Sequence, residues 1–386
     1  MKSPRFSRRV FSVAALTALA AVGSVPALAQ SDITFGGDAR AFAMGGAGIA
    51  LQNLSGANRI NPATLAFEVR RFDLIAPSIA VRTENDLSVS RVYDYFFTGR
   101  LKDGGDLNDI VRTFSGKDSV FGVNGSAGIR VGSVEVSGFA VGKGRLLINN
   151  DLRNWIESGR PGEGSSTAIR DNAPNSRADV IAAGYYNLPA IGVGVRLPMP
   201  ESARQHVAVG VRVKVMRAYY AHYLADAAVL DAAADAFAAP ELRGRDYLDK
   251  RGVGADLGFL WRQTPRPAGV FSAGLVVANV VNPRFKFSGT DRNGAPTTVD
   301  LLKTTASLGA GYQWKGLTAA ADLVDVTGGG DSRQFRTGAE YAFGRNLALR
   351  GGYSSAGGFT YGGGLFGFNV AFGQRQPLEV VRTINF

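Results

Sequence analysis

Cysteine is absent from this 386-residue chain, and it contains only two histidines, His206 and His222. The lack of cysteine excludes disulfide scaffolds, thiolate metal sites and cysteine nucleophiles. Two histidines leave little for a zinc or copper site, so no metal or other cofactor is expected. The sequence also has neither a Gly-x-Ser-x-Gly nor a Gly-x-x-x-x-Gly-Lys-Ser/Thr motif. The protein is therefore not predicted to be an enzyme.

Charge is scarce as well, because only 19% of the residues are Asp, Glu, Lys or Arg, against about 25% in typical domains. The formal net charge is +11, with 43 basic and 32 acidic residues. Four of the bases lie at the N-terminus and the others are spread along the chain, so nucleic acid is not an expected partner. What is abundant is glycine, at 50 residues, and hydrophobic residues, at 45%. This composition excludes disorder caused by low hydrophobicity.

Residues 1–29 read as a signal peptide, with a basic start and an apolar run over Val10–Val22. Small residues precede the predicted cleavage between Ala29 and Gln30. The Arg8-Arg9 pair also fits a twin-arginine signal, so both export routes stay open. No other stretch has eighteen consecutive apolar residues, which excludes a helical membrane protein.

The region after residue 68 shows repeated alternation of apolar and polar or small residues. The clearest case is His206–Tyr219, where a valine occupies every second position from Val207 to Val215. Such a pattern predicts a strand between apolar and wet surroundings. Similar runs begin at Phe121, Val253, Phe335 and Leu347, each about 10 residues long, which is the length that a tilted transmembrane strand needs. The sequence therefore predicts an all-β protein, a transmembrane antiparallel β-barrel over residues 68–386.

Loop lengths give the strand number. With short turns at one end and long loops at the other, we predict fourteen strands, and sixteen as the alternative. Strand 178–197 is expected to bend at a bulge near Pro189, where the apolar parity slips. An Ala-rich stretch over 224–239 predicts a helix in the outer loop 220–250.

The two faces of the strands predict which residues meet lipid and which face the lumen. We expect Val209, Val211, Leu257 and Tyr341 to face lipid. The lumen is expected to carry Arg212, Lys214, Asp256, Arg336, Glu340 and Arg350. These charges are predicted to pair with one another; a plug acid such as Asp38, or the carboxylate of an amphipathic ligand, is the alternative partner of the bases.

The C-terminus ends in alternating apolar residues closed by Ile384 and Phe386. This ending resembles the signal by which bacterial outer-membrane barrels are recognised for insertion, although Val381 stands where a smaller residue is expected. The resemblance implies an outer-membrane location, contact with the barrel-assembly machinery during insertion, and outer-membrane lipids as neighbours.

Residues 30–67 precede the first strand and form a predicted plug, which a barrel this wide requires because side chains alone fill only about eight strands. The stretch is rich in small residues, and asparagines flank its Pro62 turn. Its motif residues are Met44, Gly45, Gly46, Asn58, Asn61, Pro62 and Ala63.

These motifs resemble the plug of the FadL-type outer-membrane transporters of hydrophobic compounds, a superfamily that includes TraF-like plasmid-transfer proteins and PorV-like barrels. Asn279-Val-Val-Asn-Pro283 and Gly338-Ala-Glu-Tyr341 are also similar to TraF- and PorV-type sequences. The FadL-type resemblance implies passive uptake of hydrophobic small molecules such as long-chain fatty acids. The TraF- and PorV-like resemblance implies the alternative, a barrel that serves conjugation, secretion or outer-membrane assembly through protein partners. The oligomeric state stays open.

Overall fold

The structure is a computed structural model that describes residues 39–52, 60–67, 72–84, 119–162, 168–200, 204–226, 248–263, 267–290, 296–328, 333–344, 346–373 and 378–385. The predicted cleavage site at Ala29 and Gln30, Asp38, Asn58 and Phe386 lie outside these residues.

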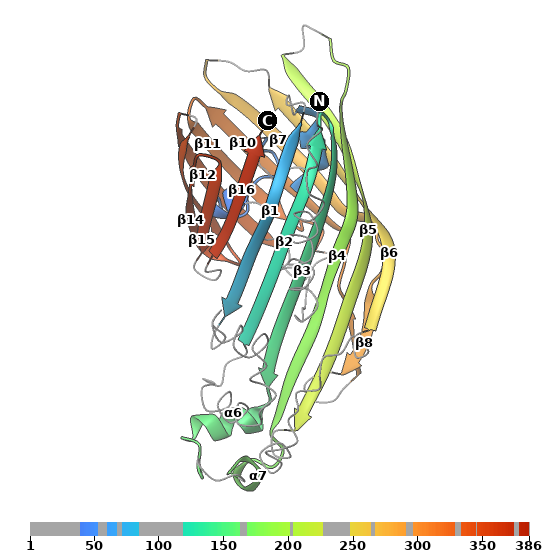
Figure 1. Cartoon of the computed structure of the whole chain (residues 1–386), viewed down its shortest axis with the longest axis vertical. Coiled ribbons are helices and arrows are strands. Elements are labelled where there is room, and N and C mark those ends of the chain that lie inside the picture. The colour runs from blue at the N-terminus through green and yellow to red at the C-terminus, as the bar shows by residue number, and fades with distance from the viewer. Residues whose placement is uncertain are drawn as a thin grey trace, which may run out of the picture.

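Within the described ranges, fourteen antiparallel strands close into one barrel (Figure 1). Each strand pairs with its neighbour along the chain, and β1 pairs with β16 to close the wall. The prediction of an all-β antiparallel barrel of about fourteen strands is confirmed. The wall consists of β1 (Asp73–Glu84), β2 (Ser119–Val131), β3 (Val134–Ile148), β4 (Arg177–Arg196), β5 (Gln205–Asp226), β6 (Leu248–Gln263), β7 (Val270–Val281), β10 (Thr305–Trp314), β11 (Leu317–Val324), β12 (Gln334–Phe343), β13 (Leu347–Ser354), β14 (Gly358–Leu365), β15 (Phe368–Gly373) and β16 (Leu378–Asn385).

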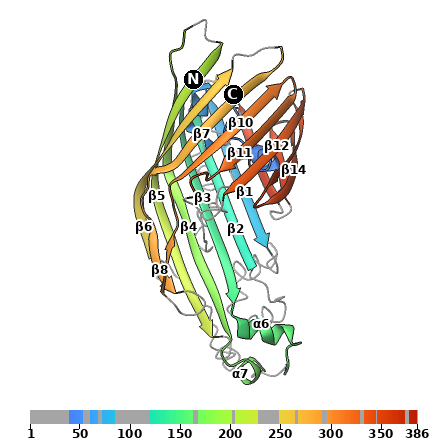
Figure 2. The same ribbon diagram turned by 180° about the vertical axis from the view of Figure 1, so that it is seen from behind.

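The barrel wall is much taller on one side than on the other (Figures 1 and 2). β5 has 22 residues, whereas β15 has 6. A strand of 22 residues measures about 70 Å along its own axis, against an apolar band about 25 Å tall in barrels of this kind. The β4–β5 register shifts between Asn187 and Ala190, which is the bulge that the parity slip near Pro189 predicts. The tall side therefore extends well beyond the height of a membrane.

The two ends of the barrel differ in their connections. Tight turns such as Phe366-Gly367, where both residues have positive φ, lie at the end where β1 begins beside the end of β16 (Asp73 opposite Asn385). The long connections lie at the other end. Two helices, α6 (Asn150–Glu157) and α7 (Ala168–Asn172), lie at that end, and Trp155 of α6 packs against α7.

The helix predicted at 224–239 is wrong at its start, because β5 continues as a strand to Asp226; residues 227–239 lie outside the described part of the chain. The alternation of apolar and polar residues weakens after Tyr219, because a strand segment outside the membrane needs no apolar outer face. Within the described ranges, the helices at this end of the barrel lie in the 149–176 connection.

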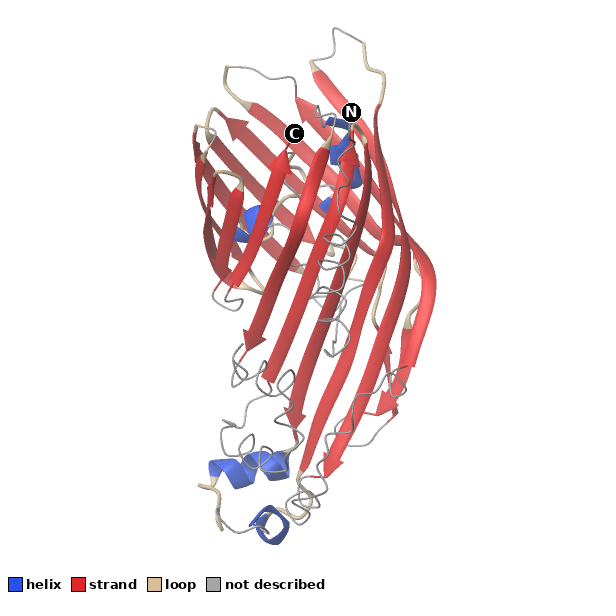
Figure 3. Ribbon diagram, in the orientation of Figure 1, coloured by secondary structure: helices blue, strands red, loops and turns tan. Residues whose placement is uncertain are grey.

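Two small elements lie against the inner face of the barrel wall, and the helices of the first are drawn in blue in Figure 3. The plug contributes a short helix, α2 (Ala39–Ala43), and a 3-10 helix, η2 (Pro62–Phe67). α2 contacts β13 to β16, whereas η2 contacts β4 to β6, so the plug reaches across the lumen. The second element is the hairpin of β8 (Lys286–Thr290) and β9 (Pro296–Asp300). None of the helices in the described ranges is long and apolar enough to cross a bilayer.

Candidate functional site

The plug backbone lies directly on glycines of the inner wall. A Cβ at Gly338 would lie 2.3 Å from the Met44 carbonyl oxygen, and a Cβ at Gly352 would lie 2.2 Å from the Gly45 nitrogen. On the opposite side, a Cβ at Gly210 would lie 2.3 Å from the carbonyl carbon of Pro62. Any side chain at these wall positions would clash with the plug backbone. The glycines of the wall therefore allow the plug backbone to lie directly against the strands.

Hydrogen bonds from several strands hold the plug in place. Gly45 donates its N–H to Thr360 Oγ1 at 2.9 Å. The Asp322 carboxylate accepts from the N–H groups of Gly48 (2.7 Å) and Ile49 (3.1 Å). Ser272 Oγ donates to the Ala50 carbonyl at 2.8 Å. Plug backbone groups that are buried away from water thus find partners on β7, β11 and β14.

Asn61 joins the two halves of the plug to the wall. Its Nδ2 donates to the carbonyl oxygens of Ile49 (2.9 Å) and Phe259 (3.1 Å), and its Oδ1 accepts from Ala63 N at 3.0 Å. The side chain is fully buried, so each of these bonds satisfies a group that water does not reach. Met44 and Ala63 are also buried, Gly45 and Gly46 have positive φ, and Pro62 begins η2.

The structure places Arg212, Lys214 and Asp256 together in a buried network. Lys214 Nζ donates to Asp256 Oδ1 and to Asn279 Oδ1, both at 2.6 Å, and Arg212 Nη1 lies 3.8 Å from Asp256 Oδ2. Asn279 adopts φ +53° at a register break between β6 and β7, and its N–H donates to Asp256 at 2.8 Å. The sequence reasoning did not assign Asn279 to this network, although its signal was the Asn-Val-Val-Asn-Pro motif.

A second charged group connects the plug to β12 and β13. Glu340 accepts from Arg350 Nε at 2.5 Å and forms an ion pair with Arg40 of α2. Here a plug base pairs with a wall acid. The alternative in which wall bases hold a plug acid such as Asp38 stays a prediction, because Asp38 lies outside the described residues. Arg336 is buried on β12 and donates to Gln334 Oε1 at 2.9 Å.

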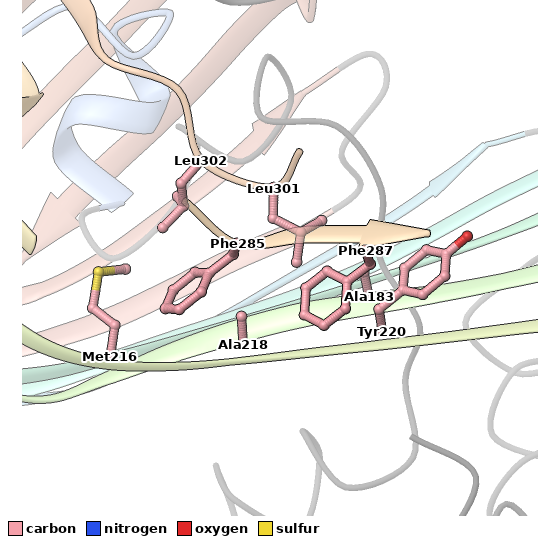
Figure 4. Close-up of a cluster of buried hydrophobic side chains, with 8 residues drawn as sticks. All are labelled: Ala183, Met216, Ala218, Tyr220, Phe285, Phe287, Leu301 and Leu302. Carbon is pink, nitrogen blue, oxygen red and sulfur yellow. The ribbon is translucent and has the colours of Figure 1, made fainter. Parts of the chain in front are cut away.

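Beyond the charges, the inner face of β5 becomes apolar. Met216, Ala218 and Tyr220 of β5 pack with the β8–β9 hairpin, and the Tyr220 and Phe287 rings stack with centroids 5.5 Å apart (Figure 4). The cluster consists of Ala183, Met216, Ala218, Tyr220, Phe285, Phe287, Leu301 and Leu302. Tyr185 extends this surface to Phe139, whose ring centroid lies 6.0 Å away. The sequence analysis missed this cluster.

The outer face carries the residues expected to meet lipid. Val209, Val211, Leu257 and Tyr341 are all exposed in the isolated chain, with between 39% and 51% of their surface accessible. Aromatic side chains mark the end with tight turns, where Trp314 Nε1 donates to the Pro267 carbonyl at 3.1 Å. Ile384 lies in β16 opposite Leu74 of β1.

No group of three or more metal-ligating side chains gathers within the described ranges. With an apolar outer face and a plug on its inside, the closed barrel has the architecture of an outer-membrane β-barrel. It belongs to the family described as F plasmid transfer operon, TraF, protein, whose model matches residues 105–323. The TraF-like resemblance predicted from the sequence is confirmed by this match.

Several solved channel structures are similar to the chain. The TodX deltaS2S3 mutant monoaromatic hydrocarbon channel has 14% identity and a TM-score of 0.47, with 90% of this chain and 99% of that chain covered. The Pseudomonas putida toluene transporter TodX has 12% identity, coverage of 90% and 96%, and a TM-score of 0.37. The Ralstonia pickettii toluene transporter TbuX has 11% identity, coverage of 90% and 98%, and a TM-score of 0.36. No curated protein matches the chain in sequence.

Proposed function

We propose that this barrel passively admits hydrophobic small molecules such as long-chain fatty acids, and that the end with long connections faces the outside of the cell. The observation that carries the proposal is the apolar inner surface of the tall wall. Barrel interiors that hold water are polar, yet here Phe139, Tyr185, Met216 and Tyr220 line the inside of β3 to β5. An apolar molecule gains about 25 cal/mol for each Å² that it removes from water on such a surface.

The β8–β9 hairpin supports the same function. Phe287 of this hairpin and Phe285 just before it are almost completely buried on this inner surface, so the surface already accepts aromatic rings. A hydrophobic ligand that enters from outside would take the place of these rings and make contacts of the same kind. The plug resemblance to FadL-type transporters points to the same class of ligand.

Retained lipids are the first test. Protein purified from native membranes in a mild detergent should carry a fatty acid or a similar apolar molecule, detected by mass spectrometry. Proteoliposomes that contain the protein should take up a fluorescent fatty acid faster than protein-free liposomes. An empty barrel together with uptake at the protein-free rate would contradict the proposal.

Neighbouring tyrosines on β5 provide a matched pair of variants. Tyr220 is buried on the inner surface, whereas Tyr219 belongs to the outer face. Tyr220→Gln should lower uptake because it places an amide in the apolar surface, and Tyr219→Gln should leave uptake unchanged. Equal uptake by both variants would argue against a route along this surface.

A second function is favoured by the TraF family membership and by α6 and α7, which project at the far end of the tall wall. In this alternative the barrel serves conjugation, secretion or outer-membrane assembly through protein partners. A protein complex that survives extraction in mild detergent, around a barrel without bound apolar molecules, would support it over uptake.

A further inference from the structure

Two arginines end the apolar outer face of β5 and β6. In the β5–β6 register, Val211 pairs with Leu257, Val215 with Val253, and the next outward pair is Arg217 with Arg251. Val215 and Val253 are 48% and 53% exposed in the isolated chain. The change from aliphatic to cationic therefore takes place in one step along the outer face.

The length of this apolar face places the arginine pair at a membrane boundary. The outward pairs from Val207–Trp261 to Val215–Val253 are aliphatic or aromatic. Nine strand residues span about 30 Å, which becomes roughly 23 Å for a strand tilted by about 40°. An apolar band of about 25 Å is what a barrel presents to lipid. Arg217 and Arg251 therefore lie at the level of the lipid head groups, on the side of the long connections.

Among the described residues, the charges at this position are not balanced. Like charges directly opposite each other destabilise an antiparallel pair. Arg217 Nε donates to Asp249 Oδ2 at 2.9 Å, but among the described residues Arg251 forms no ion pair. One carboxylate thus faces two guanidinium groups, and an anion from outside would be attracted to the pair.

Aromatic rings hold one of the two guanidinium groups in place. Arg217 lies over the Tyr219 ring, 5.0 Å from its centroid, and the Tyr186 ring lies 6.0 Å from that of Tyr219. Tyrosine rings are typical of the membrane interface. A guanidinium fixed in this way loses less side-chain freedom when it binds an oxyanion with two parallel hydrogen bonds.

We propose that Arg217 and Arg251 bind a phosphate group of a phosphorylated glycolipid in the outer leaflet, with the acyl chains of that lipid lying on Val213, Val215 and Val253. The head-group level of the pair demands a ligand that carries both a phosphate and acyl chains, and two guanidinium groups suit a phosphate that bears more than one negative charge. This site rests on the orientation of the barrel proposed above but not on uptake, because it faces lipid rather than the lumen.

The test measures diphosphorylated lipid A bound to the purified full chain by native mass spectrometry. Each basic residue near an anionic membrane surface strengthens binding about fivefold, so the double variant Arg217→Ala/Arg251→Ala should bind this lipid about 30-fold more weakly. Dephosphorylated lipid A should bind to the wild-type protein as weakly as diphosphorylated lipid A binds to the variant. Arg217→Lys/Arg251→Lys should recover part of the affinity, because the charge remains and the two-pronged geometry is lost.

A control removes two cations elsewhere. Arg170 on α7 and Lys315 beside Trp314 both lie away from this boundary, so Arg170→Ala/Lys315→Ala should leave lipid A binding unchanged. All variants should keep the heat-sensitive gel mobility of a folded barrel. The proposal would be overturned if Arg217→Ala/Arg251→Ala and Arg170→Ala/Lys315→Ala lost equal affinity for diphosphorylated lipid A. It would also be overturned if the wild type bound phosphatidylglycerol and diphosphorylated lipid A equally well. Competition by inorganic phosphate alone at low millimolar concentration would also overturn it, because it would show a free-phosphate site.

Discussion

Replacing Gly352 with alanine should push the plug away from the barrel wall. The added Cβ would lie 2.2 Å from the Gly45 nitrogen and from the Met44 carbonyl carbon, which is closer than any real Cβ contact. Neither side yields easily, because Gly45 N is hydrogen-bonded to Thr360 at 2.9 Å and Gly352 is paired with Gly338 inside the sheet. Overpacking of this kind costs about 1–3 kcal/mol.

Gly351 provides the control, because it precedes Gly352 on the same strand and a Cβ there meets nothing within 4 Å. Alanine inside a strand is preferred over glycine by about 0.5–1 kcal/mol, so Gly351→Ala should be neutral or slightly stabilising. The assay is the temperature at which the folded band converts to the unfolded band on a denaturing gel. Protease cleavage after Arg40 measures the release of the plug.

A plug-deleted protein that lacks residues 31–67 separates the plug clash from any defect in the wall. In this background Gly352→Ala should no longer lower the conversion temperature, because Met44 and Gly45 are gone. The reasoning is refuted if Gly352→Ala destabilises both backgrounds equally, or if Gly351→Ala is as harmful as Gly352→Ala in the intact protein.

Three further outcomes are expected. Val211→Arg should reduce the folded fraction in a membrane assembly assay, because a charge on the lipid face costs about 2–4 kcal/mol, while Asn154→Arg on exposed α6 should not. Asp256→Asn should lower the conversion temperature strongly, since it leaves Lys214 and Arg212 without their shared carboxylate. Breaking a buried ion pair costs about 3–5 kcal/mol. A variant as stable as the wild type would contradict a stabilising role of this network. Deletion of Phe386 should slow insertion, measured as the fraction of heat-sensitive barrel over time, and an unchanged rate would refute its role as an insertion signal.

The strands could be predicted from the sequence because their two faces meet different solvents. Wherever a strand separates lipid from a polar interior, as from Val207 to Val215, alternation is strong and boundaries follow from it. The same reasoning failed past Tyr219, because the part of β5 beyond this residue lies outside the membrane and no longer separates lipid from a polar interior. Its outer face therefore has no reason to alternate with its inner face.

The interior contacts were only partly predictable. Asn61 and the Met44-Gly45-Gly46 stretch carry a recognisable motif, because a plug that lies against a wall needs small residues and a side chain that satisfies buried backbone groups. The Arg40–Glu340 pair joins residues that are 300 positions apart, and no local pattern encodes such a distance. β8 carries Phe287 and directly follows Phe285, and it has only five residues, which is too short to distinguish a strand from a loop.

The inner face of β5 arranges the lumen in three layers, and their order bears on any uptake route. From the end with tight turns outward, this face presents Gly210 against the plug, then Arg212 and Lys214, and then the apolar positions from Met216 to Tyr220. Successive inner residues are about 7 Å apart. The first apolar position, Met216, lies three such steps from Gly210, about 20 Å from the plug along the strand, with the charged layer between them. A hydrophobic molecule that enters from outside would meet the Lys214–Asp256–Asn279 network before it meets the plug. Because this network is hydrogen-bonded and largely neutralised within itself, a ligand carboxylate would have to displace Asp256 to reach Lys214. On the proposed uptake route the charged layer would be the first barrier inside the barrel, and the plug behind it would be the second.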